Sequence, residues 1–180
     1  MGSTLERLVK EKLLKKDMVM AARILTSAAA DARMSGVKLP AMSSAGSGNH
    51  GLTAILPIWA VKDYIECISE KQVLKAIALS HIITAYIKAF TGRLSAICGC
   101  SITAGAGAKA SCAFKLSTAA NSAVNSALFA LHGVNVMETD GIIAKTPEQT
   151  MKNVGQLSTQ GMIETDRVIL DIMVNKHFSS

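Results

Sequence analysis

Apolar residues recur at helical spacing along most of this 180-residue chain, and no segment shows the alternation of a half-buried strand. The longest pattern predicts one helix over residues 4–35, ending at Gly36. Its apolar positions are Leu5, Leu8, Val9, Leu13, Ala21, Ile24 and Leu25. Further helices are predicted over residues 52–67, 70–89, 93–107, 109–132 and 147–175. We therefore expect an all-α fold, a compact multi-helix domain in which the Ala/Gly-rich segment 93–107 is a buried central helix.

Two capping boxes mark helix starts in the second half of this pattern. Ser69-Glu70-Lys71-Gln72 places Ser69 at the N-cap and Gln72 at the third helical position. Thr146-Pro147-Glu148-Gln149 has the same form, with proline at the first helical position. The helix that follows Thr146 is expected to be interrupted near Gly155 or Gly161.

Composition narrows the class of protein. Aromatic residues make up only 4% of the chain, which favours close helix packing within a single domain over residues 1–180. The net charge of +6 is concentrated early, and its basic residues have no interleaved aromatics. These residues are Arg7, Lys10, Lys12, Lys15 and Lys16. We interpret the run as a solvated helix face and expect no nucleic-acid partner, although a basic chain also suits an anionic small-molecule substrate.

Cysteine usage and apolar runs bear on location. The four cysteines do not form a disulfide framework in a chain of this size, and the charged segment from Met1 to Asp17 is unlike a signal peptide. We therefore expect reduced thiols and a cytoplasmic protein. The longest apolar stretch, Val73 to Phe90, contains Lys75, His81 and Lys88, which argues against a membrane-spanning helix.

A glycine- and serine-rich run is the first candidate site. It reads Ser43-Ser44-Ala45-Gly46-Ser47-Gly48-Asn49-His50-Gly51, within a predicted loop from Val37 to Gly51. Small residues let backbone amides approach a ligand, and the serine hydroxyls and Asn49 add hydrogen-bonding groups that suit a carboxylate. His50 could bind substrate or move a proton. The alternative is a plain surface turn.

The same run admits a different interpretation. Ser47-Gly48-Asn49-His50 looks like the substrate-carboxylate loop of pyridoxal-phosphate serine/threonine dehydratases. Those enzymes also need a polyglycine phosphate loop and a Schiff-base lysine on an α/β scaffold. This chain has neither a polyglycine run nor strand–helix alternation, so the pyridoxal-phosphate interpretation is the weaker one.

Cys98-Gly99-Cys100 is the second candidate site. Cysteine thiolates are the usual ligands of iron–sulfur clusters, and Cys112 is a further candidate ligand. The alternative is a pair of small core residues, a common role of free cysteine. On a regular helix, side chains two positions apart point about 200° away from each other, so the thiols of Cys98 and Cys100 would not readily bind the same cluster. Cys67 lies in an ordinary amphipathic stretch and is expected to be structural.

Together these segments resemble the family of iron–sulfur L-serine dehydratase alpha chains and L-cysteine desulfidases. The resemblance runs from about Ala21 to Met173 and rests on 43–51, 92–100, 108–112, 140–143 and 161–166. It implies a [4Fe–4S] cluster that acts as a Lewis acid on the β-substituent of an amino acid, releasing water or sulfide and yielding pyruvate and ammonia. By resemblance, Cys98 or Cys100 is a cluster ligand, and Ser47, Gly48, Asn49 and His50 lie in the substrate loop. The candidate metal ligands are therefore Cys98, Cys100 and Cys112, and His50 is the catalytic candidate. The substrate-binding residues would be Ser43, Ser44, Ser47, Gly48, Asn49 and Gly51.

The chain departs from that family in two ways. Members have a longer connection between the counterparts of Gly107 and Ala108, which holds a helix and a cysteine-aspartate-glycine segment with the expected second ligand. Single-chain members also carry an N-terminal domain that supplies another ligand. We therefore expect a missing segment between 107 and 108, and a cluster that depends on it or on a partner, either a beta-chain-like domain or a second copy. The alternative is a non-catalytic helical subunit or small-molecule binding module that has lost the cluster.

Overall fold

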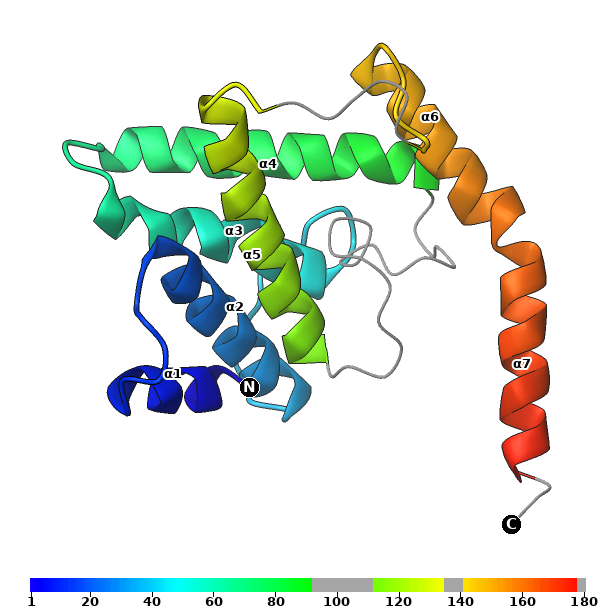
Figure 1. The fold of residues 1–180 in the computed structure, drawn as a ribbon, viewed down its shortest axis with the longest axis horizontal. Coiled ribbons are helices and arrows are strands. Elements are labelled where there is room, and N and C mark those ends of the chain that lie inside the picture. Colours follow the sequence, from blue (N-terminus) through cyan, green and yellow to red (C-terminus); the bar gives the residue numbers. More distant parts are fainter. Residues whose placement is uncertain (92–111, 135–140, 178–180) are drawn as a thin grey trace. The chain divides into compact units, whose positions relative to one another are not determined.

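The computed structural model describes residues 1–91, 112–134 and 141–177 (Figure 1). Within these ranges the regular structure is helical, apart from one isolated bridge between Ser44 and Ser47, which confirms the all-α fold. Contacts divide the chain into two units, Met1–Tyr86 with Gly99–Asn135, and Ile87–Cys98 with Val136–Ser180. The expected central helix over 93–107 lies outside the described residues. The single-domain organisation stays a prediction.

The helix predicted over residues 4–35 is wrong in one respect, because it is two helices. These are α1 (Gly2–Lys10) and α2 (Met18–Met34). Lys12 has a positive φ of 61°, and the Asp17 carboxylate caps α2 by accepting the amide of Met20 at 2.8 Å. The chain reverses between them, so that α1 packs on α2. The predicted stop at Gly36 is confirmed, since its φ is +79°.

Helix α2 is the centre of the first unit. It contacts α1, α3 (Gly48–Val61) and α5 (Cys112–Leu131), and α5 lies along it (Figure 1). Small residues dominate the contacts, which lets the helix backbones approach closely. One buried cluster contains Ala22, Ala60, Ala120 and Val124, and a second contains Ala30 and Leu116. The alanine-rich composition is therefore used for close packing, as the sequence predicts.

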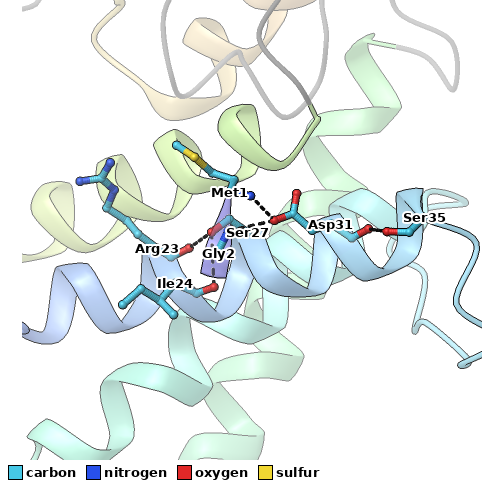
Figure 2. A network of polar contacts seen from close by, with 7 residues as sticks. All are labelled: Met1, Gly2, Arg23, Ile24, Ser27, Asp31 and Ser35. Carbon is cyan, nitrogen blue, oxygen red and sulfur yellow. Dashed lines mark hydrogen bonds and ion pairs between the residues drawn. The ribbon is translucent and has the colours of Figure 1, made fainter. Parts of the chain in front are cut away.

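The chain start is fixed to α2 through Asp31 (Figure 2). The Asp31 carboxylate accepts hydrogen bonds from the Met1 ammonium and from the Gly2 amide, the latter at 2.9 Å. A Cβ on Gly2 would lie 2.6 Å from the Cα of Ala28, so the helices touch at this glycine. Partial burial acts to raise the pKa of Asp31, but the two hydrogen bonds and the ammonium charge outweigh it and hold this pKa below its ordinary value.

We expect Asp31→Asn to destabilise the protein by up to about 1 kcal/mol at pH 7, because the carboxylate is partly exposed. A carboxyl with a lowered folded-state pKa stabilises the fold above its unfolded pKa of about 3.9, and this stabilisation is lost as the pH falls through the lower folded-state value. Urea unfolding of wild type and Asp31→Asn at pH 7 and pH 2.5 measures the difference in unfolding free energy. An unchanged difference between wild type and variant at both pH values would contradict the assignment. Glu11→Gln, in an exposed pair with Arg7, is the control.

The predicted capping boxes are where the sequence places them. At the start of α4 (Glu70–Thr91), the Ser69 amide donates to Gln72 Oε1 at 2.9 Å, and the Gln72 amide donates to Ser69 Oγ at 3.3 Å. At the start of α6 (Pro147–Gln156), the Gln149 amide donates to Thr146 Oγ1 at 3.2 Å. Both helix starts are confirmed.

The second unit contains α6, a π-type turn at Leu157–Gly161, and α7 (Ile163–His177). The predicted interruption is therefore confirmed. Gly155 contacts the backbone of Phe90, whose carbonyl oxygen would lie 2.8 Å from an added Cβ. A glycine is needed at position 155 because the backbone of Phe90 lies too close to leave room for a side chain.

Helix α4 is long and apolar enough, by length and composition alone, to cross a membrane. Only 6% of its apolar 18-residue stretch is buried within the structure. It also carries Lys75, His81 and Lys88. The absence of a membrane partner stays a prediction.

Candidate functional site

The Ser43–Gly51 run is divided between a tight turn and the first turn of a helix. Predicted as a loop up to Gly51, it becomes helical at Gly48, where α3 begins. This correction has a local cause, because the Ser47 side chain caps α3 and accepts the His50 amide at 3.4 Å. The signal was present in the sequence as a serine five residues before the apolar run that begins at Leu52.

The turn itself is closed by two backbone hydrogen bonds. The amides of Ser44 and Ser47 each donate to the carbonyl of the other residue at 3.0 Å. The two residues between them both have positive φ, 47° at Ala45 and 81° at Gly46, as in tight two-residue turns. Ala45 is thus held in a conformation that favours glycine, and such strain is common beside functional sites.

We expect Ala45→Gly to stabilise the protein by roughly 0.5–1 kcal/mol, since relief of the left-handed backbone at Ala45 exceeds the entropy gained by the unfolded chain. Thermal or urea unfolding measures it. Ala85→Gly, on the exposed side of helix α4, is the matched control and should destabilise by about 1 kcal/mol. Equal changes in both variants would show that Ala45 carries no strain.

Ser44 joins the turn to α4. Its side chain is 2% exposed, and its Oγ lies 2.9 Å from Nδ1 of His81. This hydroxyl therefore fixes the turn to a helix that begins more than twenty residues later in the chain. His81 is therefore hydrogen-bonded within the fold.

Gly51 lies where the segment before the turn passes over α3. A Cβ at this position would lie 1.7 Å from the carbonyl oxygen of Met42 and 3.1 Å from the Cα of Ser43. Only glycine permits this backbone approach. Gly51 therefore positions the turn and has no side chain to offer a ligand.

Sequence reasoning missed Arg33, which reaches the site from the last turn of α2. Its Nη1 donates to Asn49 Oδ1 at 2.6 Å. A Cβ on Gly48 would lie 2.8 Å from its Nε and Nη2, so the guanidinium rests on the Gly48 backbone. The side chain is exposed to solvent. No sequence signal links Arg33 to a segment sixteen residues away, because the return of the chain creates the contact.

The other predicted residues are placed as follows. Ser43 is exposed, and His50 lies in the first turn of α3 with its ring Nδ1 buried. Cys98 and Cys100 lie outside the described residues, and Cys112 is described only as the first residue of α5. Among the described residues, no group of three or more His, Cys, Asp or Glu side chains is arranged to hold a metal ion.

A family model described as "Serine dehydratase alpha chain" matches residues 1–110 and 107–171, nearly the whole chain. The chain belongs to the serine dehydratase alpha chain family. This agrees with the resemblance carried by the glycine-rich run and the cysteine pair. The two matched stretches meet at residues 107–110.

The names of the matching curated relatives state no activity. A "UPF0597 protein" of Desulfatibacillum aliphaticivorans is 57% identical over 99% of this chain and 48% of its own length. A second, of Desulfotalea psychrophila, is 56% identical over 98% of this chain and 48% of its own. A third, of Clostridioides difficile, is 41% identical over 96% of this chain and 48% of its own. No solved structure matches.

These relatives are longer in two respects. The chain spans about half the length of the curated relatives it matches. The alignment with the Desulfatibacillum aliphaticivorans protein also runs to 212 positions, which is 32 more than the 180 residues of this chain. That relative therefore carries residues within the aligned region that this chain lacks.

Proposed function

We propose that this chain is the substrate-binding part of a deaminating lyase that removes water from L-serine or sulfide from L-cysteine, yielding pyruvate and ammonia. The observation that carries the proposal is the fixed arrangement of the Ser43–Gly51 run in a member of the serine dehydratase alpha chain family. Both amino acids have the same carboxylate and amine, so one carboxylate-binding turn serves either.

In this proposal the residues of the run bind and orient the amino acid. Ser47 holds the first turn of α3 in place, and Asn49 presents its amide next to Arg33. Gly48 leaves room for the Arg33 guanidinium and Gly51 for the Met42 carbonyl, so the two glycines fix the turn beside the first backbone amides of α3, which would bind the carboxylate. His50, in the same helical turn, is the candidate that moves a proton of the substrate.

The proposed cofactor is a [4Fe–4S] cluster, with Cys98, Cys100 and Cys112 as candidate ligands. When bound, such a cluster supplies a Lewis acid for the departing β-substituent. Thiolate is the appropriate ligand type. Since the described residues hold no three-ligand group, the ligands would come from the cysteine-bearing stretch, from a segment that this chain lacks, or from a partner.

We further propose that the lacking segment falls between Gly107 and Ala108 and that a beta-chain-like domain or a second copy completes the site. Two findings support this. The family matches meet at residues 107–110, and the alignment with the Desulfatibacillum aliphaticivorans protein is longer than this chain. The half-length coverage of the relatives supports a further domain or partner. Reduced cysteines and a cytoplasmic location remain part of the proposal.

The second candidate is a non-catalytic helical subunit or small-molecule binding module. The longer alignment favours it, because a chain without the lacking segment would also lack any ligand in it. The two candidates differ in iron content and turnover, whereas both retain the turn at Ser44–Ser47.

Anaerobic purification followed by iron, sulfide and pyruvate measurements tests the proposal. The chain alone should hold less than one cluster per polypeptide. A variant that receives the corresponding segment of the Desulfatibacillum aliphaticivorans protein between Gly107 and Ala108, with the remaining half of that protein added, should gain iron and release pyruvate from L-serine or L-cysteine. Full iron loading without pyruvate from either amino acid would reject the lyase. Stable, stoichiometric cluster assembly on the chain alone would reject the dependence on the lacking segment.

A further inference from the structure

We propose that Arg33 binds the carboxylate of a small α-amino acid at the Ser43–Gly51 turn and so determines the substrate class of the site. The inference rests on the proposed function for the location of the substrate. It goes beyond that function by assigning carboxylate recognition to a residue of α2, outside the glycine-rich run.

The first argument is that three neighbouring features hold the guanidinium in one place. Asn49 Oδ1 accepts from Nη1 at 2.6 Å. The bare backbone of Gly48 leaves room for the guanidinium, whose Nε and Nη2 atoms would lie 2.8 Å from an added Cβ. Arg33 itself projects from the last turn of a 17-residue helix, a rigid base. A long side chain that would otherwise sample many rotamers is thus oriented before any ligand binds.

The second argument is electrostatic. The ion pairs of the described residues join Met1 with Asp31, Arg7 with Glu11, and Lys10 with Glu6, and none includes Arg33. Asn49, which does contact Arg33, is neutral and does not compensate the charge. The positive charge also lies beside the N-terminal turn of α3, where the helix dipole is positive as well. The negative C-terminal end of α2, from whose last turn Arg33 projects, offsets part of this charge, and the guanidinium together with the N-terminal turn of α3 still favours an anion between them.

The third argument concerns the chemistry of the ligand. A guanidinium has five N–H donors, and its planar fork matches the two oxygens of a carboxylate. One donor is used by Asn49, and the side chain is exposed, so the fork is accessible from solvent. The serine- and glycine-rich run meets the guanidinium at Gly48 and Asn49, and its small residues suit the short remainder of a small amino acid. We therefore assign the anion as a carboxylate with little beyond it, and phosphate, which the same fork also matches, is the alternative that the experiment tests.

Binding of unreactive ligands tests the assignment without depending on turnover. L-Alanine carries the carboxylate and amine of the proposed substrates but no leaving group, and L-alaninamide lacks the carboxylate. Isothermal titration calorimetry of the full 180-residue chain should detect L-alanine and not L-alaninamide. Arg33→Gln should weaken L-alanine binding about tenfold or more, and Arg33→Lys should recover only part of it, because lysine lacks the fork.

Two further variants separate recognition from folding. Gly48→Ala keeps the charge of Arg33 but displaces the guanidinium, so it should weaken L-alanine binding as Arg33→Gln does. Arg7→Gln removes an arginine of equal charge from the exposed surface of α1 and should leave binding unchanged. Melting temperatures of all variants establish that each is folded.

Several outcomes would overturn the inference. They are unchanged L-alanine affinity in Arg33→Gln, equal binding of L-alanine and L-alaninamide by the wild type, and no binding of either. Inorganic phosphate that competes as well as L-alanine would identify a general anion site and also reject it. The proposed function fails separately. Arg33-dependent L-alanine binding without lyase activity rejects the lyase alone, and lyase activity with an unchanged KM in Arg33→Gln rejects the role of Arg33 alone.

Discussion

Gly51→Ala should destabilise the protein by at least about 2 kcal/mol, and it should also displace the Ser43–Gly51 turn. The reason is steric, because the new Cβ would meet the Met42 carbonyl oxygen at 1.7 Å and one of the two backbones must move. Replacing glycine by alanine inside a helix ordinarily stabilises by up to about 1 kcal/mol. The sign of the change in unfolding free energy therefore identifies the close approach directly.

The measurement is urea unfolding of Gly51→Ala beside Gly161→Ala. At Gly161 the nearest atom to an added Cβ is the flexible end of Leu157, Cδ1 at 3.0 Å, so this control should change stability by less than about 1 kcal/mol. L-Alanine binding, measured as for Arg33, should weaken in Gly51→Ala alone. A stable Gly51→Ala protein would mean that Met42 does not cross α3 at this point.

The second large effect is expected for Leu116→Ala in α5. Leu116 is fully buried in a cluster with Ala30 of α2, and the truncation leaves a cavity between the two helices. Such substitutions typically cost about 2–5 kcal/mol. The melting temperature should fall by several degrees. Because α2 carries Arg33, loosened packing of α2 on α5 should also weaken ligand binding at the turn.

Leu131→Ala is the matched control for this prediction. Leu131 is the last residue of the same helix and is 81% exposed, so its truncation should change the free energy of unfolding by no more than about 0.5 kcal/mol. Similar losses of stability at the two positions would mean that α5 does not pack on α2 through Leu116.

Local sequence signals determined much of the helical architecture. Ser69 with Gln72, and Thr146 with Pro147, cap helices at the expected residues, because a capping interaction involves atoms only three positions apart. The all-α class and the stop at Gly36 follow from periodicity and from the conformational freedom of glycine. The order of short motifs likewise predicted the family, and the family model confirms it.

The sequence predicted only part of the candidate site. The sequence predicts that the Ser43–Gly51 run binds a ligand, and that role stays a prediction. The chain did not indicate that Ser44 would contact His81 on α4, or that Gly48 would lie under a guanidinium. The cysteines named as ligands lie outside the described side chains, so their role also stays a prediction.

Only the tertiary structure decided the features that join distant parts of the chain. The periodic pattern of residues 4–35 is compatible with one helix, yet the close packing of Gly2 on Ala28 requires the chain to reverse between α1 and α2. Likewise, Arg33 meets Asn49 because α3 returns along α2. Spacing and capping are set by neighbours within a few residues, so the sequence determines them by itself. Which helix faces meet depends on the packing of the whole unit, and that packing placed an arginine at the candidate site.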